Sequence, residues 1–449
     1  MRVLIIGGSD AGISAALRAN EIEPAVEITV LMADAFPNYS ICGLPFYLSG
    51  ETPEWKQLAH RTEFAGIEIL TECKAQDIDI HLHAVRALDR SGQERLLKYD
   101  RLIVATGARA LSPQISGLEL QGVFPVRTME DSFRIHDYLE KNSVSSAVVI
   151  GSGYIGLEMT DALVHRGLSV TLVGSSEAVL PTVDSVLGKL IEQELIEKNV
   201  KVFSGVTATS IEKKGSSNLS VNGDRNLSAN GDVVIVGGGV SPDSLLASTS
   251  GLETGPTGAI RVNQRMETSV AGVYAAGDCA ETWHRVLREF TYLPLDTTSH
   301  KQGRIAGENA VGGDREFAGS VGTQVVKVFD LAIARTGLRD SEAVHAGFAS
   351  KTVGSTQWDH KRYYPGAREL NFRVTGDQRS RRLLGAQLLG HWQASVAKRI
   401  DVFAAALFHG MLVEDLSDLD LSYTPPLGSP WDAVQLSAQA WSRAVARRR

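Results

Sequence analysis

Cys42 has the residue type and setting for redox chemistry, in the segment NYSICGLPFYLSG at 38–50. A chain that enters a helix here would place the thiol near the helix N-terminus, where the dipole and free N–H groups favour the thiolate. The following Gly43 permits close approach of a flat ring. With no CxxC or CxxxxC partner, a redox-active Cys42 would cycle through a mixed disulfide, a persulfide or a sulfenic acid. The alternative is a buried packing cysteine, which is our interpretation of Cys73 and Cys279.

A glycine-rich turn, GSGYIG at 151–156, is the second candidate for chemistry. It follows an apolar strand and opens a helix, which is the context that a dinucleotide-binding GxGxxG motif requires. Gly151 allows a tight turn, Gly153 lets the backbone approach a pyrophosphate, and Gly156 allows close helix–strand packing. The helix N-terminus supplies the dipole and free N–H groups. The alternative is a tight turn without a ligand.

The strand after this motif bears on the choice of nucleotide, because an acidic residue usually ends it and holds the ribose hydroxyls of NAD. Here VTLV is followed by Gly174, Ser175 and Ser176, and the first acid is Glu177. Absence of the carboxylate removes repulsion against a 2′-phosphate, and Ser175 can donate a hydrogen bond to it. The sequence therefore favours NADPH over NADH, although no arginine stands at this point of the chain.

A related turn, GGSDAG at 7–12, lies near the N-terminus, with Ser9 in place of the middle glycine. The strand after it ends in LMAD, so Asp34 is the available ribose-binding acid, and Met32 stands where an acid would be expected. The predicted cofactor-binding glycines of this turn are Gly7, Gly8 and Gly12.

Two further strands end in glycine turns, ATGA at 105–108 and AAGD at 275–278. Asp278 follows a strand end, where a carboxylate can accept hydrogen bonds from the ribityl chain of a flavin. The predicted cofactor-binding residues of these turns are Thr106, Gly107, Gly277 and Asp278.

The elements that position these residues form two β-Gly-α-β units about 145 residues apart, a spacing typical of two doubly wound nucleotide-binding domains. A stretch rich in Gly, Ser and Asn at 214–231 is expected to be a surface hairpin or loop, before a buried strand within 232–240. The predicted strands and helices of the two units are 2–6, 13–19 and 27–31, then 147–150, 157–166 and 170–173.

The pattern changes from about Val321. Strands at 323–329 and 383–390 precede a helix at 396–410, which predicts a separate α+β region. We place the last domain boundary near residue 320.

Composition narrows the class of protein. The chain has 449 residues, 43% hydrophobic and 22% charged, and a formal net charge of −7. This charge argues against nucleic acid as a partner. We expect no signal peptide and no membrane-spanning segment, and three cysteines are too few for a disulfide framework. The sequence therefore predicts a cytoplasmic protein, and it offers no metal site.

Together these motifs resemble the pyridine nucleotide–disulfide oxidoreductases, and more narrowly the single-cysteine branch with coenzyme A disulfide reductase, NADH oxidase and NADH peroxidase. The resemblance covers essentially the whole chain, and further segments that carry it are PLDTTSHKQGRIAGENAVGG, KVFDLAIARTGL, YYPGA and YTPPLGSPWD. It implies an α/β fold of two Rossmann-like domains and a C-terminal α+β dimerisation domain, with FAD and NAD(P)H as cofactors and a homodimeric state. The implied domains are FAD-binding at 1–115 and 242–320, NAD(P)H-binding at 116–241, and dimerisation at 321–449.

The resemblance also assigns roles to single residues. Cys42 matches the redox cysteine that faces the flavin, and Glu158 matches a residue on the nicotinamide side. Asp278 and His300 match positions that contact FAD.

Two tyrosines are implied to act across the dimer. Tyr423, in SYTPP, matches a tyrosine that reaches the active site of the partner subunit. One of Tyr363 and Tyr364 should be the second, and we favour Tyr363. A phenol can donate a hydrogen bond to a thiolate or sulfenate and supply a proton to a leaving thiolate. The alternative for both is domain packing.

Departures from the family pattern bear on the substrate. Coenzyme A disulfide reductases usually have an asparagine where this chain has Ile41, and tend to carry arginines at the positions of Asn20 and Glu21, although Arg18 remains. Lost cations should weaken binding of a polyphosphate by more than about 1 kcal/mol. Oxidases and peroxidases of this branch place a histidine where this chain has Asp10.

The sequence therefore predicts an FAD-dependent NAD(P)H oxidoreductase that reduces a small disulfide or persulfide through Cys42. One alternative is an NADH oxidase or peroxidase that cycles Cys42 through sulfenic acid. Another is a reductase of a small electron-carrier protein, or a redox sensor.

Overall fold

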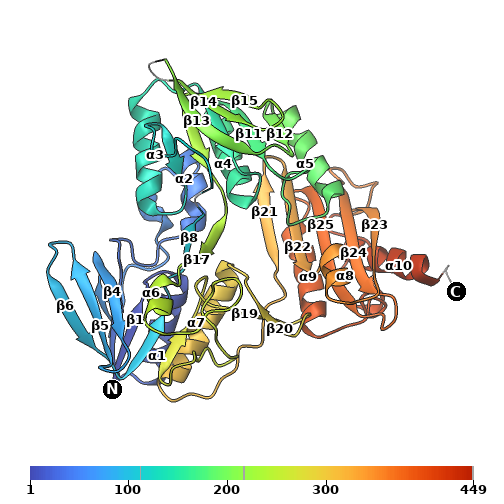
Figure 1. Cartoon of the computed structure of the whole chain (residues 1–449). Helices are drawn as coiled ribbons and strands as arrows, with labels where there is room; N and C mark the ends of the chain where they lie inside the picture. Colours follow the sequence, from blue (N-terminus) through green and yellow to red (C-terminus); the bar gives the residue numbers. More distant parts are fainter. Residues whose placement is uncertain (112, 216–217, 447–449) are drawn as a thin grey trace.

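The computed structural model describes residues 1–111, 113–215 and 218–446. The first of three regions has a parallel five-stranded sheet of order β18-β7-β1-β2-β3. Strand β18 comes from much later in the sequence than β7, its neighbour, so the chain leaves this region and returns to it (Figure 1). Its elements are β1 (Arg2–Ile6), α1 (Asp10–Ile22), β2 (Glu27–Leu31), β3 (Glu68–Leu70), β7 (Arg101–Val104), β18 (Val273–Ala275) and α7 (Asp296–Ala310).

Helices α1 and α7 pack closely because α7 presents glycine to α1. A Cβ at Gly303 would overlap the carbonyl oxygen of Ala11, and one at Gly307 would overlap that of Ala15. This contact brings the first glycine turn and the start of α7 together, although 286 residues separate Ser14 and His300, which meet there.

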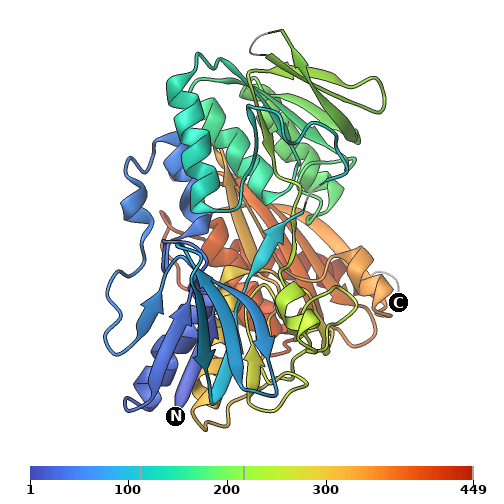
Figure 2. The same cartoon turned by 60° about the vertical axis from the view of Figure 1, so that its left-hand side comes forward.

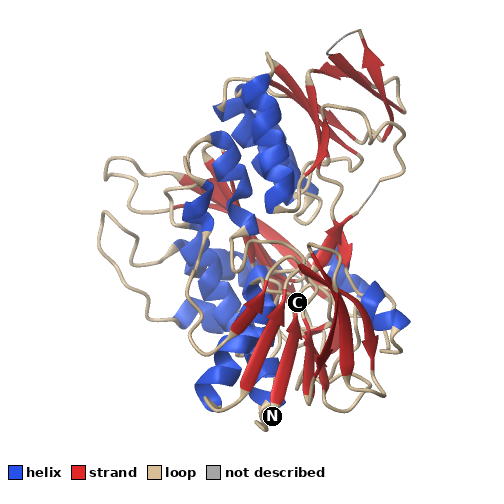
Figure 3. Ribbon diagram, turned by 90° about the vertical axis from the view of Figure 1, so that its left-hand side faces the viewer, coloured by secondary structure: helices blue, strands red, loops and turns tan. Residues whose placement is uncertain are grey.

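The second region has a parallel sheet of order β12-β11-β10-β16-β9 and a three-stranded antiparallel sheet, β13-β14-β15. Helices stand beside the strands of the larger sheet (Figure 3). Its elements are β9 (Val123–Pro125), α3 (Met129–Lys141), β10 (Ser146–Ile150), α4 (Tyr154–His165), β11 (Ser169–Gly174), α5 (Ser185–Glu197), β12 (Lys201–Ser204), β13 (Ala208–Lys214), β14 (Asn218–Gly223), β15 (Ser228–Gly231) and β16 (Val233–Val236).

The chain passes between the first two regions at an antiparallel pair, β8 (Ala108–Ala110) and β17 (Val240–Pro242). Thr106 donates its hydroxyl to the carbonyl oxygen of Asp243 at 2.5 Å, which joins the outgoing and returning segments. The second region is therefore an insertion in the first.

The third region is an antiparallel sheet of order β21-β22-β25-β24-β23. Buried side chains such as Phe372 and Phe403 join the sheet to α9. The region lies behind the N-terminal half of the chain in Figure 2. Its elements are β21 (Gln324–Val328), β22 (Leu331–Gly337), α8 (Asp340–His345), β23 (Ser350–Trp358), β24 (Glu369–Asp377), β25 (Leu383–His391), α9 (Val396–Phe408), η3 (Asp415–Asp418) and α10 (Ala433–Ala446).

Smaller elements complete the first region, including the antiparallel sheets β4-β5-β6 and β19-β20. These elements are η1 (Ile41–Gly43), α2 (Leu44–Ser49), η2 (Trp55–Leu58), β4 (Cys73–Asp79), β5 (Ala84–Asp89), β6 (Glu94–Lys98), α6 (Leu245–Thr249), β19 (Thr282–His284) and β20 (Glu289–Thr291).

The α/β fold class is confirmed, and the predicted β-Gly-α-β units are present with their strands in place. The first helix is longer than predicted, from Asp10 to Ile22, and the stretch around residue 225 is a hairpin between β14 and β15. Within the described ranges, no helix combines the length and the apolar character that crossing a bilayer requires.

Candidate active site

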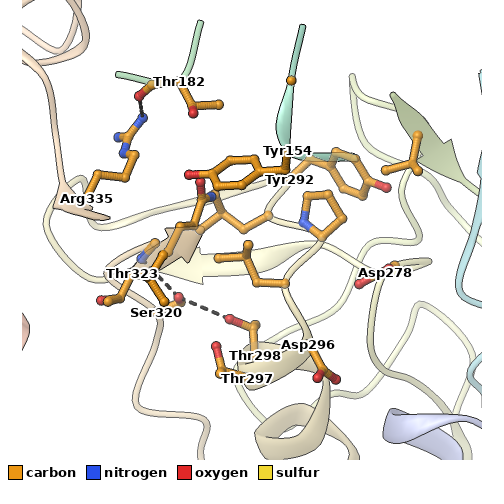
Figure 4. A pocket seen from close by; sticks show the side chains of 18 of the residues that line it. Tyr154, Thr182, Asp278, Tyr292, Asp296, Thr297, Thr298, Ser320, Thr323 and Arg335 are labelled. Carbon is orange, nitrogen blue, oxygen red and sulfur yellow. Dashed lines mark hydrogen bonds between the residues drawn. The ribbon is translucent and has the colours of Figure 1, made fainter. Parts of the chain in front are cut away.

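The three regions meet at a cavity of about 1860 Å³. Figure 4 shows part of it, with Tyr154, Tyr292 and Asp278 along its wall and Arg335 on the side of the third region. The predicted site residues that line it are Cys42, Gly151, Gly153, Glu158, Ser175 and Asp278. The others lie outside this lining: Gly7, Gly8, Gly12, Asp34, Thr106, Gly107, Gly156, Gly277, His300, Tyr363 and Tyr423.

Cys42 faces the cavity from the short turn η1, two residues before α2 begins at Leu44. The residue is exposed, and both other cysteines, Cys73 and Cys279, are buried. Their burial agrees with the packing role that the sequence predicted for them.

The sequence predicted that the position of Cys42 near a helix N-terminus favours its thiolate form. When only the protein's own groups act on the thiol, this prediction is wrong. The partly enclosed setting and the negative charges of Asp296, Glu158 and Asp10 raise the pKa of Cys42 to about 11. Helix α2 has only six residues, so its dipole is weak beside these carboxylates. The sulfur therefore needs an additional positive or proton-accepting influence to react as a thiolate.

Glu158 extends from α4 into the same cavity. Burial, together with the nearby charge of Asp161, raises its pKa to about 7. A carboxyl group that titrates near neutral pH in a cavity is typical of a functional residue.

The turn before α4 has the geometry that a pyrophosphate requires. Gly151 has φ +114°, and a Cβ at Gly156 would overlap the carbonyl oxygen of Gly151. A Cβ at Gly153, in contrast, would meet nothing within 4 Å, so this glycine leaves space free beside the helix N-terminus. No side chain caps the helix at Gly153, and the first N–H groups of α4 are available to a ligand.

The turn before α1 is built in the same way, but it opens at the carboxyl edge of the first sheet. A Cβ at Gly7 would overlap the carbonyl oxygen of Ala105, and one at Gly12 would overlap that of Gly7. Ser9 is the N-cap residue of α1 but makes no side-chain capping bond, so N–H groups of this helix are also available.

Two residues near this turn have local structural roles. The side chain of Met32 lies where a Cβ of Gly8 would be, so a larger residue at this position would displace Met32. Asp34 accepts a hydrogen bond from the N–H of Phe36 at 2.8 Å, and burial raises its pKa. The assigned ribose contact of Asp34 stays a prediction.

Asp278 is held at the end of β18 by two partners. Ser299 donates to it at 3.1 Å, and the guanidinium of Arg127 lies 3.4 Å away. The hydroxyl oxygen of Tyr292 is buried in the same wall, with no hydrogen-bond partner among the described residues. An unpaired buried hydroxyl costs free energy, and a bound polar ring system would satisfy it. These groups fit a flavin.

His300 lies between two carboxylates beside the first glycine turn. Its Nε2 is 3.2 Å from Asp10 and 3.6 Å from Asp296, and its Nδ1 is 2.8 Å from the hydroxyl of Ser14. The sequence search missed Asp296, the first residue of α7, which lines the cavity with Cys42.

Asp10, Asp296 and His300 shift one another's pKa values. Burial alone would raise the pKa of Asp10, but bonds from His300 outweigh it and lower that pKa. The bond to Asp10 raises the pKa of His300, while burial and the charge of Asp10 raise that of Asp296 to about 6. These shifts favour a protonated His300 beside an ionised Asp10.

The two favoured tyrosines lie together on the surface of the third region. Tyr363 and Tyr423 are 74% and 44% exposed, and the N–H of Lys361 donates to the carbonyl oxygen of Pro425, joining their loops. Limited desolvation and the neighbouring Tyr363 raise the pKa of Tyr423. Tyr364 packs instead against His360. Neither favoured tyrosine lines the cavity of its own chain.

Arginines of the third region hold the segment of the second region that borders the cavity at 180–184. Arg335 donates to the carbonyl oxygen of Thr182 at 2.7 Å, and Arg339 to that of Pro181 at 2.6 Å (Figure 4 shows the first). Arg373 forms an ion pair with Asp184. No local motif marks these contacts, which is why sequence reasoning missed them.

Comparison with known proteins assigns the family. Residues 1–303 match the pyridine nucleotide-disulphide oxidoreductase family, and residues 323–433 match its dimerisation domain. The chain is 36% identical over 443 residues to the NAD(P)H sulfur oxidoreductase (CoA-dependent) of Pyrococcus furiosus, with 98% of each chain covered. It is 28% identical to the coenzyme A disulfide reductase of Staphylococcus haemolyticus, over 97% of this chain and 98% of the relative.

Among solved structures, an NAD-dependent persulfide reductase from A. fulgidus superposes with a TM-score of 0.96 at 35% identity, over all of this chain and 84% of the other. The matched dimerisation domain supports a homodimer. These matches confirm the family, the oxidoreductase class and the domain types inferred from the sequence. The chain belongs to the pyridine nucleotide-disulphide oxidoreductase family.

Proposed function

We propose that this protein is an FAD-dependent NAD(P)H oxidoreductase that reduces a small disulfide or persulfide through Cys42. The observation that carries the proposal is that Cys42 faces the same cavity as the GSGYIG turn and Glu158. A thiol in reach of a nucleotide-binding turn, with no second cysteine beside it, fits a single-cysteine redox cycle. The persulfide and disulfide reductases among its relatives support this class of substrate.

FAD and NAD(P)H fit the two glycine turns. Bound FAD would supply the two-electron chemistry that links hydride from NAD(P)H to reduction of the Cys42 sulfur. We assign the turn at Gly7, Gly8 and Gly12, with Asp34, to the FAD nucleotide, and Thr106, Gly107, Gly277, Asp278 and His300 to the rest of FAD. Gly151, Gly153, Gly156 and Ser175 bind NAD(P)H, and Glu158 orients the nicotinamide.

The substrate step takes place at the cysteine. The Cys42 sulfur attacks one sulfur of R–S–S–R, forms a mixed disulfide and releases RS⁻, which takes a proton to become RSH. Two electrons and one further proton then cleave the mixed disulfide, releasing the second RSH and restoring Cys42. With a persulfide the sulfur released is hydrogen sulfide.

Coenzyme A is a poor fit as the thiol. Arg18, the cation that remains near the end of α1, is 2.6 Å from Glu308 and 2.9 Å from Glu21, and only 15% of its side chain is exposed. A cation already neutralised by two carboxylates has little charge left for a phosphate. We therefore propose a smaller or less anionic disulfide or persulfide.

The domain limits follow from this assignment. We propose FAD binding at 1–115 and 242–320, NAD(P)H binding at 116–241 and dimerisation at 321–449. In the homodimer, Tyr363 and Tyr423 reach the Cys42 site of the partner subunit and supply a proton there. The free thiols favour a reducing compartment, and we place the protein in the cytoplasm.

Peroxide or oxygen reduction is the second candidate, because one observation favours it. The imidazole of His300 lies 3.2 Å from Asp10, the residue that stands where oxidases and peroxidases place a histidine. A protonated imidazole in this cluster, whose Asp296 lines the cavity with Cys42, would assist cleavage of an O–O bond there.

One experiment separates these functions. The FAD-loaded protein is reduced without oxygen by NADPH or NADH and re-oxidised with disulfides, polysulfide, peroxide, oxygen or a carrier protein. We expect fastest turnover with a disulfide or polysulfide, and a loss of about 100-fold or more in Cys42→Ser. The control, Cys73→Ala, should keep its activity. Disulfide turnover at the original rate in Cys42→Ser contradicts the proposal, and faster turnover with peroxide or oxygen selects the second candidate.

A further inference from the structure

The hairpin between β14 and β15 brings an arginine to the end of β11, where the sequence shows none. Arg225 and Asn226 both have positive φ, 49° and 61°, the backbone geometry of a tight two-residue hairpin turn. Asp224 anchors this turn, since its carboxylate accepts from the N–H of Thr207 at 2.8 Å and its N–H donates to the carbonyl oxygen of Thr207 at 3.1 Å. The position of the turn is therefore fixed by the segment after β12.

That segment borders both the cavity and the end of β11. Thr207 lines the cavity together with Ser175 and Ser176, and the N–H of Gly205 donates to the carbonyl oxygen of Ser176 at 2.7 Å. A Cβ at Gly205 would lie 3.0 Å from the guanidinium of Arg225. The guanidinium is thus next to the strand end that holds the adenine ribose in this class of fold.

Among the residues that the structure describes, Arg225 pairs there with Glu177 alone. The guanidinium lies 3.3 Å from the Glu177 carboxylate, and the side chains are 61% and 81% exposed. An ion pair this exposed to solvent is weak, so it gives way to a stronger anion. A phosphate monoester carries close to two negative charges and accepts bidentate hydrogen bonds from a guanidinium.

We propose that Arg225 binds the 2′-phosphate of NADPH, with Ser175 and Ser176 donating hydrogen bonds to it, and that the protein consequently prefers NADPH to NADH. The inference rests on the proposed function, because it names the nucleotide that the same cavity takes. Glu177 opposes the phosphate and holds Arg225 at the strand end until NADPH binds.

The test compares Arg225→Gln and Glu177→Gln with wild type, using both nucleotides. Arg225→Gln should lower kcat/KM for NADPH by about tenfold or more through KM, and leave NADH within about twofold. Glu177→Gln should lower KM for NADPH. Lys213→Gln, on the neighbouring exposed strand β13, is the matched control and should change neither.

Binding gives a readout independent of turnover. By calorimetry, wild type should bind NADP⁺ more tightly than NAD⁺, and Arg225→Gln should lose that difference. Equal effects on both nucleotides, no effect, or a wild-type preference for NADH overturns the inference. Failure of the proposed function would instead appear as absent disulfide reduction with either nucleotide, while the binding difference stays intact.

Discussion

At the scale of single residues, the reactivity of Cys42 depends on carboxylates that reach it from other elements. Asp296 begins α7, Asp10 begins α1 and Glu158 lies on α4, and the charge of each raises the pKa of Cys42. The protein thus keeps this thiol protonated until a bound group or a proton acceptor changes the balance. Because the thiolate is the reactive form, a protonated Cys42 reacts more slowly with oxidants although it is exposed.

Removal of one of these charges should make Cys42 more reactive. Asp296 has a pKa of about 6 and is therefore an anion at pH 8, where its charge disfavours the thiolate. We expect Asp296→Asn to raise the rate of Cys42 alkylation by iodoacetamide about two- to fivefold at pH 8, and to have little effect at pH 5, where the carboxyl group is protonated.

Alkylation is followed by mass spectrometry of the Cys42 peptide. Asp137→Asn, in which an exposed residue of α3 outside the cavity lining is changed, serves as the control and should react like wild type. An unchanged or slower rate in Asp296→Asn would mean that the carboxylate does not act on the thiol.

Sequence reasoning succeeded at this scale where the controlling residues are adjacent in the chain. The turn at Gly151–Gly156 was predictable because its geometry depends on the strand before it and the helix after it. The thiolate prediction for Cys42 was wrong because desolvation and charge come from three separate elements. The arginine at the end of β11 was missed for the same reason, since Arg225 and Glu177 are 48 residues apart.

At the scale of elements, a partly buried ion pair joins β22, α8 and the 180–184 segment of the second region. Arg335 lies 2.7 Å from Glu342 and also donates to the carbonyl oxygen of Thr182. One guanidinium therefore bonds to both the third and the second region. Burial alone would raise the pKa of Glu342, but hydrogen bonds and charge from Arg335 and Arg339 outweigh it and lower that pKa to about 2. Sequence patterns predicted the neighbouring β21, β25 and α9, but neither β22 and α8 nor the contacts between them.

Loss of this pair should destabilise the protein in a pH-dependent way. The pKa of Glu342 is lower in the folded state than its unfolded value of about 4.3. Its contribution to stability is therefore fully present above the unfolded pKa and is lost as pH falls toward 2. We expect Glu342→Gln to lower the free energy of unfolding by about 1–3 kcal/mol at pH 7, since the buried Arg335 loses its counter-charge.

Urea unfolding at pH 7 and pH 3.5 measures this difference. The gap between wild type and Glu342→Gln should narrow at pH 3.5, and Glu289→Gln, at an exposed position of β20, should show no gap at either pH. A gap that is equal at both pH values would exclude an electrostatic origin.

At the scale of the whole molecule, the cavity is built where three regions meet, yet one chain supplies only part of the proposed site. Cys42, Glu158 and Asp278 line the cavity, and Tyr363 and Tyr423 lie on exposed loops outside it. Other exposed aromatic and apolar side chains follow Tyr423 within ten residues along the chain, including Leu427 at 78% and Trp431 at 57% exposure. Such a patch is typical of an interface, which agrees with the matched dimerisation domain.

The tyrosine assignment can be tested by mixing subunits. One chain carries Cys42→Ser and a second carries Tyr363→Phe with Tyr423→Phe, each with its own affinity tag, and the doubly tagged dimer is purified. If the tyrosines serve the partner subunit, one of the two sites in this hybrid has both an intact Cys42 and intact tyrosines. Its activity should be about half that of wild type, whereas the tyrosine-variant homodimer should lose about 100-fold or more.

The expected activity of the hybrid is different if the tyrosines act within their own subunit. If each tyrosine serves the cysteine of its own chain, neither site of the hybrid is complete, and its activity stays near that of the two parent homodimers. A hybrid of wild type with Cys42→Ser fixes the scale, because it has one complete site under either geometry and should also reach about half. Activity of the tyrosine-variant homodimer equal to wild type would show that these phenols pack the interface and supply no proton.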